Sequence, residues 1–172
     1  DNSTCVFDFS QQTFPKLLQE AGYQTALVGK LHLEANPAGF DYWEIVPGQG
    51  NYYNPDFIRM DGTTCREEGY LTNIITDKSL DWLENRRDKD KPFCIMIHHK
   101  AVHRNWLPEL KYLREYEDRE FELPDNFYDD YKGRIAAAEQ EMSIAEDMDM
   151  AYDTKVYRKG DNTRLSRMYE DF

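Results

Sequence analysis

The chain has 172 residues, which is enough for one domain with a hydrophobic core. Its formal net charge of −12 argues against nucleic-acid binding and against adhesion to anionic membranes, because both need a basic surface. No apolar run reaches the roughly 18 residues of a membrane-spanning helix, so we expect no membrane insertion. An anion would have to bind in a local basic pocket, since the overall field repels it.

A helix followed by a short strand is expected near the start of the chain. Ser10 to Thr13 supply hydroxyl caps, Pro15 suits the first helical turn, and Gly22 ends the helix. The apolar, β-branched run 23–28 then predicts a strand buried on both faces, which ends at Gly29-Lys30-Leu31-His32-Leu33.

The middle of the chain indicates a long loop, then a second helix and a second strand. Glycines and prolines punctuate residues 36–69, which predicts loops with room for a hairpin, and a loop of this length is usually functional. A helix is expected from about Thr72 to Arg87 and a buried strand from Pro92 to Ile97. This alternation predicts an α/β fold with a mostly parallel sheet flanked by helices.

The remainder of the chain has a different character. Residues 115–122 are rich in acidic side chains, residues 129–150 predict a helix, and residues 157–167 form a basic, polar tail. We therefore expect an α/β core at about 10–105 and an acidic loop-and-helix segment at about 106–172. Since the chain does not start with Met, we also expect an internal part of a longer protein, truncated at both ends.

Two groups of cationic side chains follow the two predicted strands. Lys30 and His32 alternate along the segment that leaves the first strand, so they can face one pocket. Lys100 and His103 follow the second strand. Ligands of parallel sheets bind beyond the carboxyl ends of the strands, and the two groups therefore predict an anion-binding pocket there.

Other interpretations of this region are weaker. We expect His98 to be a hydrogen-bonded core histidine, because neighbouring strand residues face opposite sides. A metal site through His99 and His103 would need further ligands. The turn Gly48-Gln49-Gly50 is too slight to be a phosphate cradle.

Three widely spaced cysteines, Cys5, Cys65 and Cys94, form neither a disulfide framework nor a zinc module. Cys94 lies in an apolar run and is expected to be a small buried hydrophobic residue. Pairing of Cys5 with Cys65 is left open.

Several segments together resemble one protein family. The run from Phe14 to Leu33, which ends in Gly-Lys-x-His-Leu, resembles the second signature of the sulfatases. Further similarity lies in four segments: Gly39–Trp43, Tyr70–Asp77, Lys91–Phe93 and Lys100–Trp106. The chain thus resembles, over roughly residues 10–145, the sulfatase branch of the alkaline-phosphatase-like superfamily. Residues 52–57 and 129–134 are similar to bacterial N-acetylglucosamine-6-sulfatases.

The resemblance implies a sulfuric ester hydrolase that removes sulfate from sulfated amino sugars of glycans. It assigns catalytic roles to three residues of this chain. Lys30 matches the lysine that grips the sulfate, His32 the histidine that helps release it from a covalent intermediate, and His103 a histidine near the leaving oxygen. Lys100, Arg104, Asn105 and Trp106 are expected to bind the sulfated carbohydrate.

The resemblance also implies groups that this chain does not carry. Such enzymes use a formylglycine, made from a Cys or Ser in a C/S-x-P-x-R motif, beside a bound Ca²⁺. None of the three cysteines lies in that motif, and we identify no metal ligand in the chain, so this part alone is expected to be inactive. The family implies a periplasmic or secreted protein.

Departures from the family pattern leave alternatives open. Leu31 replaces the usual Trp, Glu34 the usual Gly and Val102 the usual Pro, and Glu34 can change loop geometry near the anion. A phosphodiesterase or phosphonate hydrolase of the same superfamily is one alternative. A non-catalytic glycan-binding pseudoenzyme is the other.

Overall fold

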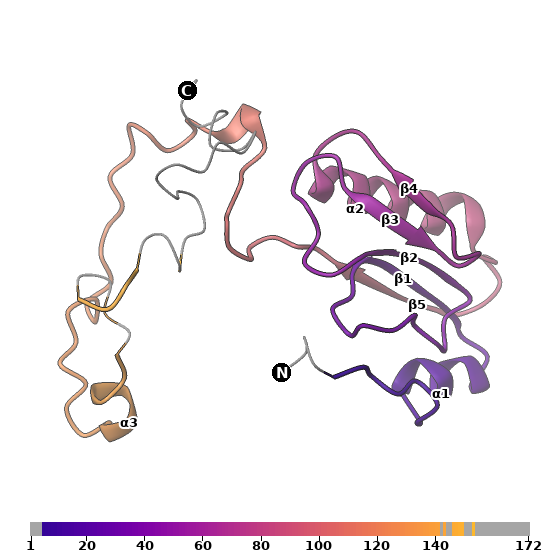
Figure 1. Cartoon of the computed structure of the whole chain (residues 1–172), viewed down its shortest axis with the longest axis horizontal. Helices are drawn as coiled ribbons and strands as arrows, with labels where there is room; N and C mark the ends of the chain where they lie inside the picture. Colours follow the sequence, from indigo (N-terminus) through magenta and orange to yellow (C-terminus); the bar gives the residue numbers. More distant parts are fainter. Residues whose placement is uncertain (1–4, 142, 144–145, 150–152, 154–172) are drawn as a thin grey trace. The chain divides into compact units, whose positions relative to one another are not determined.

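The computed structural model describes residues 5–141, 143, 146–149 and 153. The chain divides into two units, Asp1–Val102 and His103–Phe172. The first unit contains a five-stranded sheet with the order β4-β3-β2-β1-β5 (Figure 1). Its elements are α1 (Phe14–Glu20), β1 (Gln24–Lys30), β2 (Tyr42–Val46), β3 (Asp56–Arg59), β4 (Thr64–Arg66), α2 (Leu71–Asp81), a π-helical turn (Trp82–Arg86) and β5 (Phe93–His98).

The α/β fold class is confirmed, but the sheet is mixed rather than mostly parallel. Strand β1 pairs in parallel with both β2 and β5, whereas β2–β3 and β3–β4 are antiparallel. The difference arises in residues 36–69, where three strands form in addition to loops. There the short β2 adds to the edge of β1, and β3–β4 is the hairpin that the sequence allows.

Each face of the sheet packs an apolar cluster, because side chains alternate along its strands. Helix α2 covers one face, where Leu71 and Ile75 contact Val28 of β1 and Phe57 of β3. Burial of each such side chain contributes about 1.5–3 kcal/mol. The opposite face carries a second cluster formed by Leu27, Trp43 and Ile45.

Strand β5 does not have the two-sided burial that its sequence predicts. It is the edge strand of the sheet, and its apolar residues Phe93 and Ile97 are each 41% exposed. Within the part of the chain that the structure describes, no strand pairs with the outer edge of β5. The apolar composition of this strand is therefore not matched by its surroundings.

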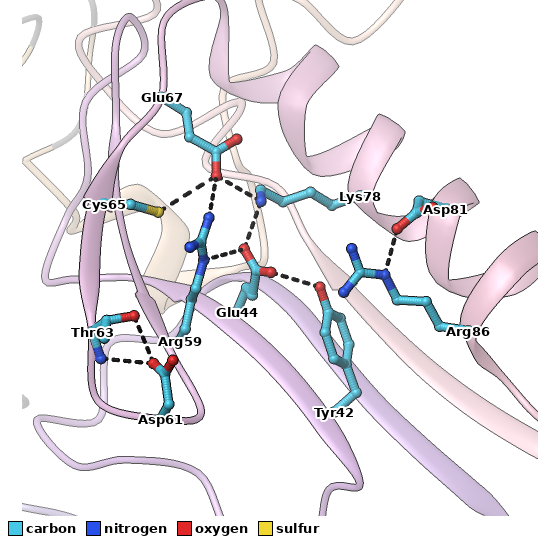
Figure 2. A network of polar contacts seen from close by, with 10 residues as sticks. All are labelled: Tyr42, Glu44, Arg59, Asp61, Thr63, Cys65, Glu67, Lys78, Asp81 and Arg86. Atoms are coloured by element: carbon cyan, nitrogen blue, oxygen red, sulfur yellow. Dashed lines mark hydrogen bonds and ion pairs between the residues drawn. The ribbon is translucent and has the colours of Figure 1, made fainter.

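A buried ion network joins the antiparallel strands to α2 (Figure 2). Glu44 of β2 accepts hydrogen bonds from Tyr42 Oη at 2.8 Å and from Lys78 Nζ at 2.5 Å. Lys78 also lies 2.7 Å from Glu67, and Arg59 lies 3.8 Å from Glu44. The network thus ties β2, β3 and α2 to one another through charged groups.

The shifted pKa values of this network follow from its hydrogen bonds. Burial by itself raises the pKa of the Glu44 carboxyl, but hydrogen bonds from Lys78 and Tyr42 outweigh burial and hold that pKa below 4.5. Burial likewise disfavours the Lys78 ammonium, yet its hydrogen bonds with Glu44 and Glu67 raise its pKa above 10.5. Both groups are therefore charged at neutral pH.

The described residues of the second unit form short helices and no long one. A 3₁₀ turn spans Leu110–Tyr112 and α3 spans Ile135–Ala138. The helix expected over 129–150 is wrong for most of that range. The side chains of Asp129 and Asp130 accept hydrogen bonds from backbone N–H groups two residues ahead and so compete with helical hydrogen bonds. Residues 142, 144–145 and 150, and the tail 157–167, lie outside the described residues.

In the described part of the chain, no helix has the length and apolar character that crossing a membrane requires.

Candidate functional site

The candidate site lies beyond the carboxyl ends of the three parallel strands of the first unit. Lys30 is the last residue of β1, Lys100 follows β5 by two residues, and Gln49 follows β2 by three. Parallel strands end at the same edge of a sheet, and residues far apart in sequence therefore meet there. Lys30 and Lys100 both lie at this edge, and their role as site residues stays a prediction.

Gln49 connects the predicted residues to one another. Its side-chain Oε1 accepts a hydrogen bond from Lys30 Nζ at 2.6 Å, and its Nε2 lies 3.0 Å from His32 Nδ1. Its backbone oxygen accepts a hydrogen bond from Lys100 Nζ at 2.9 Å. The structure thus brings Lys30, His32 and Lys100 together around Gln49. The sequence does not predict Gln49 as a site residue, because the Gly48-Gln49-Gly50 turn is too weak a motif.

The loop that presents Gln49 depends on two glycines. Gly48 and Gly50 have φ values of +56° and +66°, a backbone region that favours glycine. A Cβ atom on Gly50 would also lie 2.4 Å from Cγ1 of Val46. In the sequence, this site could have been found as a Gly-Gln-Gly turn that closely follows a strand. The glycines and prolines around β2, however, predict a loop in place of that strand.

Lys100 is the most buried cation of the site. The residue is 6% exposed, and its Nζ lies 5.0 Å from the ring centroid of Tyr52, which is itself buried. A buried ammonium keeps its charge only with nearby acceptors or π systems. The Gln49 carbonyl and the Tyr52 ring supply both. The aromatic ring of Tyr52 is therefore a core and site-lining group, as is usual for such residues.

One acidic side chain, Glu34, lies at the exposed part of the site. Partial burial lowers the pKa of Lys30. Glu34 has φ +52°, and its Oε1 lies 3.5 Å from His32 Nε2. Two ammonium groups and an imidazole can together bind a tetrahedral anion.

His98 contacts the backbone of β1 next to the site. Its Nδ1 lies 3.1 Å from the backbone oxygen of Lys30, as expected for a hydrogen-bonded histidine, but the residue is half-buried on the edge strand β5 and is not a core residue. His99 is exposed. Among the described residues, no group of three His, Cys, Asp or Glu side chains could hold a metal ion.

The remaining predicted site residues begin the second unit. His103 Nδ1 lies 2.5 Å from the backbone oxygen of Arg104, whose Nη1 lies 3.5 Å from Asp153. The backbone N–H of Trp106 donates to the His103 oxygen at 3.3 Å, and Trp106 is 47% exposed. The convergence of His103 with Lys30, and the substrate contacts of Arg104, Asn105 and Trp106, stay predictions.

Cys65 and Cys94 form no disulfide bond. Cys5 is exposed, and the Sγ of Cys65 lies 3.6 Å from Glu67. Burial raises the pKa of the Cys65 thiol. Cys94 is half-buried on the edge strand β5, and not fully buried as its apolar run predicts.

Comparison with known proteins gives consistent results. A protein of Bacteroides thetaiotaomicron named N-acetylglucosamine-6-O-sulfatase is 52% identical over 160 residues, which are 91% of this chain and 28% of that protein. The human N-acetylglucosamine-6-sulfatase is 30% identical over 123 residues, which are 62% of this chain and 22% of that protein. The chain thus spans less than a third of the length of these relatives.

A solved structure gives the same result for the fold. It is described as BT4656 in complex with its substrate D-glucosamine-2-N,6-O-disulfate, and it matches with a TM-score of 0.79 at 49% identity. The match covers 99% of this chain and 36% of that chain. In addition, the sulfatase family model matches residues 7–162. The chain therefore belongs to the sulfatase family.

Proposed function

We propose that the whole protein that contains this chain hydrolyses sulfate esters on amino sugars of glycans. The observation that carries the proposal is the gathering of Lys30, His32 and Lys100 around Gln49 at the carboxyl edge of the sheet. The proposal is supported by the 52% identity with a protein named N-acetylglucosamine-6-O-sulfatase. The substrate class we propose is accordingly glucosamine sulfated at O6.

The charges of the site suit this substrate. A sulfate ester carries one negative charge, and its cleavage develops negative charge on the leaving oxygen. Lys30 provides a positive charge for the sulfuryl group, and His32 lies next to it with an imidazole. His103 is the proposed proton donor to the leaving sugar oxygen, because an alkoxide leaves poorly without a proton. Arg104, Asn105 and Trp106 are proposed to contact the sugar.

Calcium and a formylglycine nucleophile belong to the proposal only through the family. Among the described residues, no group of three His, Cys, Asp or Glu side chains is placed to hold a metal ion. We therefore assign no residue of this chain to the metal. The nucleophile is likewise not assigned here, because none of the three cysteines lies in the C/S-x-P-x-R motif.

The location of the protein is also a proposal. The family resemblance supports a periplasmic or secreted sulfatase, which fits a glycan substrate outside the cytoplasm. Fractionation of the producing cells, with an antibody against this chain, would test it. Recovery of the protein in the cytoplasmic fraction would contradict this proposal.

The experiment that tests the function measures release of inorganic sulfate by the whole protein from 6-O-sulfated N-acetylglucosamine. An aryl phosphodiester serves as the competing substrate. We expect kcat/KM to be higher for the sulfate ester, and the variant Lys30→Ala to lose most of that activity. The variant Lys91→Ala, at an exposed lysine before β5, is the matched control and should keep it. Faster turnover of the phosphodiester would overturn the proposal.

A further inference from the structure

The hydrogen bonds of Gln49 are directional, and this direction fixes the state of a neighbouring histidine. The Lys30 ammonium can only donate hydrogen bonds, so the atom that lies 2.6 Å from its Nζ is the carbonyl oxygen of the Gln49 amide. The amide NH₂ then faces His32 Nδ1 at 3.0 Å. Since an NH₂ group can only donate, Nδ1 of His32 has to accept.

An imidazole that accepts at Nδ1 carries its proton on Nε2 in the neutral ring. The Nε2 atom of His32 is also the one that lies 3.5 Å from the Glu34 carboxylate, a partner that can accept from an N–H group. Both neighbours of the ring are therefore compatible with the same tautomer. The opposite amide orientation would point the NH₂ group at the Lys30 ammonium, where two donors would face each other.

We propose that Gln49 is a positioning residue that holds Lys30 beside His32 and fixes His32 as the Nε2–H tautomer. With Gln49 in place, the Lys30 ammonium presents its remaining hydrogen-bond donors to an anion, while the Nε2–H group of His32 faces Glu34. The same residue holds Lys100 through its backbone oxygen. The inference rests on the proposed function only for its effect on turnover, since the tautomer is a property of the resting site.

The loop around Gln49 makes this role structurally sensible. Gly50 approaches Val46 too closely to carry a side chain, so the turn places residue 49 at a fixed distance from the end of β2. The side chain of Gln49 is exposed and contributes little to the core. A replacement at this position therefore changes the hydrogen bonds of the site with little effect on packing.

The experiment records ¹⁵N spectra of the whole protein labelled only at histidine, with His32→Asn used to assign the His32 signals. We expect an unprotonated Nδ1 and a protonated Nε2 for His32 in the unchanged protein. In Gln49→Glu both side-chain oxygens accept, so Nδ1 should become protonated. In Gln49→Met, which has a similar length and no hydrogen bonds, the single tautomer should give way to a mixture. A protonated Nδ1 in the unchanged protein would overturn the inference without use of any variant.

Kinetics of the same proteins give the second measurement. We expect kcat/KM for 6-O-sulfated N-acetylglucosamine to fall about 10- to 100-fold in Gln49→Met, mostly through kcat, because misplacement of catalytic groups costs factors of this order. Gln49→Glu, which keeps the Lys30 contact, should differ from Gln49→Met in its kcat. Asn51→Ala, an exposed change in the same loop, is the control and should match the unchanged protein.

The two proposals fail in different ways. If the whole protein releases no sulfate from any ester, the proposed function is wrong, while the ¹⁵N spectra still decide the role of Gln49. If the protein is active and the Gln49 variants keep both the activity and the His32 tautomer, Gln49 is not a positioning residue.

Discussion

Replacement of Lys78 by methionine would separate the contribution of the buried ion network from that of ordinary packing. The side chains of Lys78 and Glu44 are 15% and 8% exposed, and Lys78 Nζ contacts both Glu44 and Glu67. In the Lys78→Met variant, Glu44 would be left with Tyr42 and with Arg59 at 3.8 Å. Removal of one partner of a buried pair costs about 3–5 kcal/mol. Because Tyr42 and Arg59 remain, we expect a loss near the lower end, about 3 kcal/mol.

The assay is a double-mutant cycle on the whole protein, measured by hydrogen exchange of the backbone amides in β2 and α2. Exchange reports the local opening free energy and does not require the whole protein to unfold in one step. Lys78→Met and Glu44→Gln should each speed exchange strongly. The double variant should recover much of the loss, since replacing both partners leaves no uncompensated buried charge. Lys91→Met is the control. Lys91 is exposed, and its Nζ lies 3.9 Å from the carboxylate of Asp88, so its replacement should have no measurable effect on exchange.

The cycle has a clear negative outcome. If the losses of the two single variants simply add in the double variant, the contacts of Lys78 and Glu44 carry no coupling energy. The Lys78–Glu44 pair of Figure 2 would then contribute to stability only through the apolar parts of its side chains. The same conclusion would follow if Lys78→Met and Lys91→Met had equal effects.

Three further predictions concern pH, the loop and the leaving group. The pKa of Glu44 is lowered in the folded protein, so its contribution to stability is present above the ordinary pKa of a glutamate and is lost as the pH falls through the folded pKa. The stability difference between the protein and Glu44→Gln should therefore shrink in acid when unfolding is followed against pH. Gly50→Ala should lower the thermal midpoint of unfolding more than Gly48→Ala, because both positions have positive φ but only at Gly50 would a Cβ meet Val46. Equal shifts of the midpoint would mean that the contact between this Cβ and Val46 relaxes easily. His103→Ala in the whole protein should reduce turnover of a sugar sulfate by about 10²–10⁴-fold and turnover of nitrophenyl sulfate much less, since a phenolate leaves without a proton. Equal losses in the two kinetic assays would contradict the role of His103 as a general acid.

The sequence is sufficient for the elements with strong local signals. Pro15 and Gly22 bracket the first helix, and the run 23–28 overlaps β1, because these residues prefer such conformations in almost any context. The position of Lys30 at the end of β1 follows directly from that strand. The similarity of this segment to the sulfatase signature makes the family recognisable from the order of residues alone.

Where the local signals are weak, the sequence misleads. Strand β2 is short and lies among glycines and prolines, and it forms because its backbone pairs with β1 over residues 26–30. Pairing of this kind is a long-range interaction that no window of sequence contains. The missed strand also hides the site, since Gln49 is meaningful only as a residue that follows a strand beside Lys30. In the opposite sense, residues 129–141 have helical composition, but only Ile135–Ala138 form a helix, because composition alone does not maintain a helix without packing against an apolar surface.

The sequence by itself therefore determined the fold class, the family and two cations at strand ends. The tertiary structure decided which groups meet. Lys30 and Lys100 are 70 residues apart in sequence, and only the parallel pairing of β1 with β5 and β2 brings both to Gln49. Burial of Lys100 against Tyr52 and the direction of the Gln49 amide also depend on that geometry, because hydrogen-bond direction is a property of atoms in space and not of residue order.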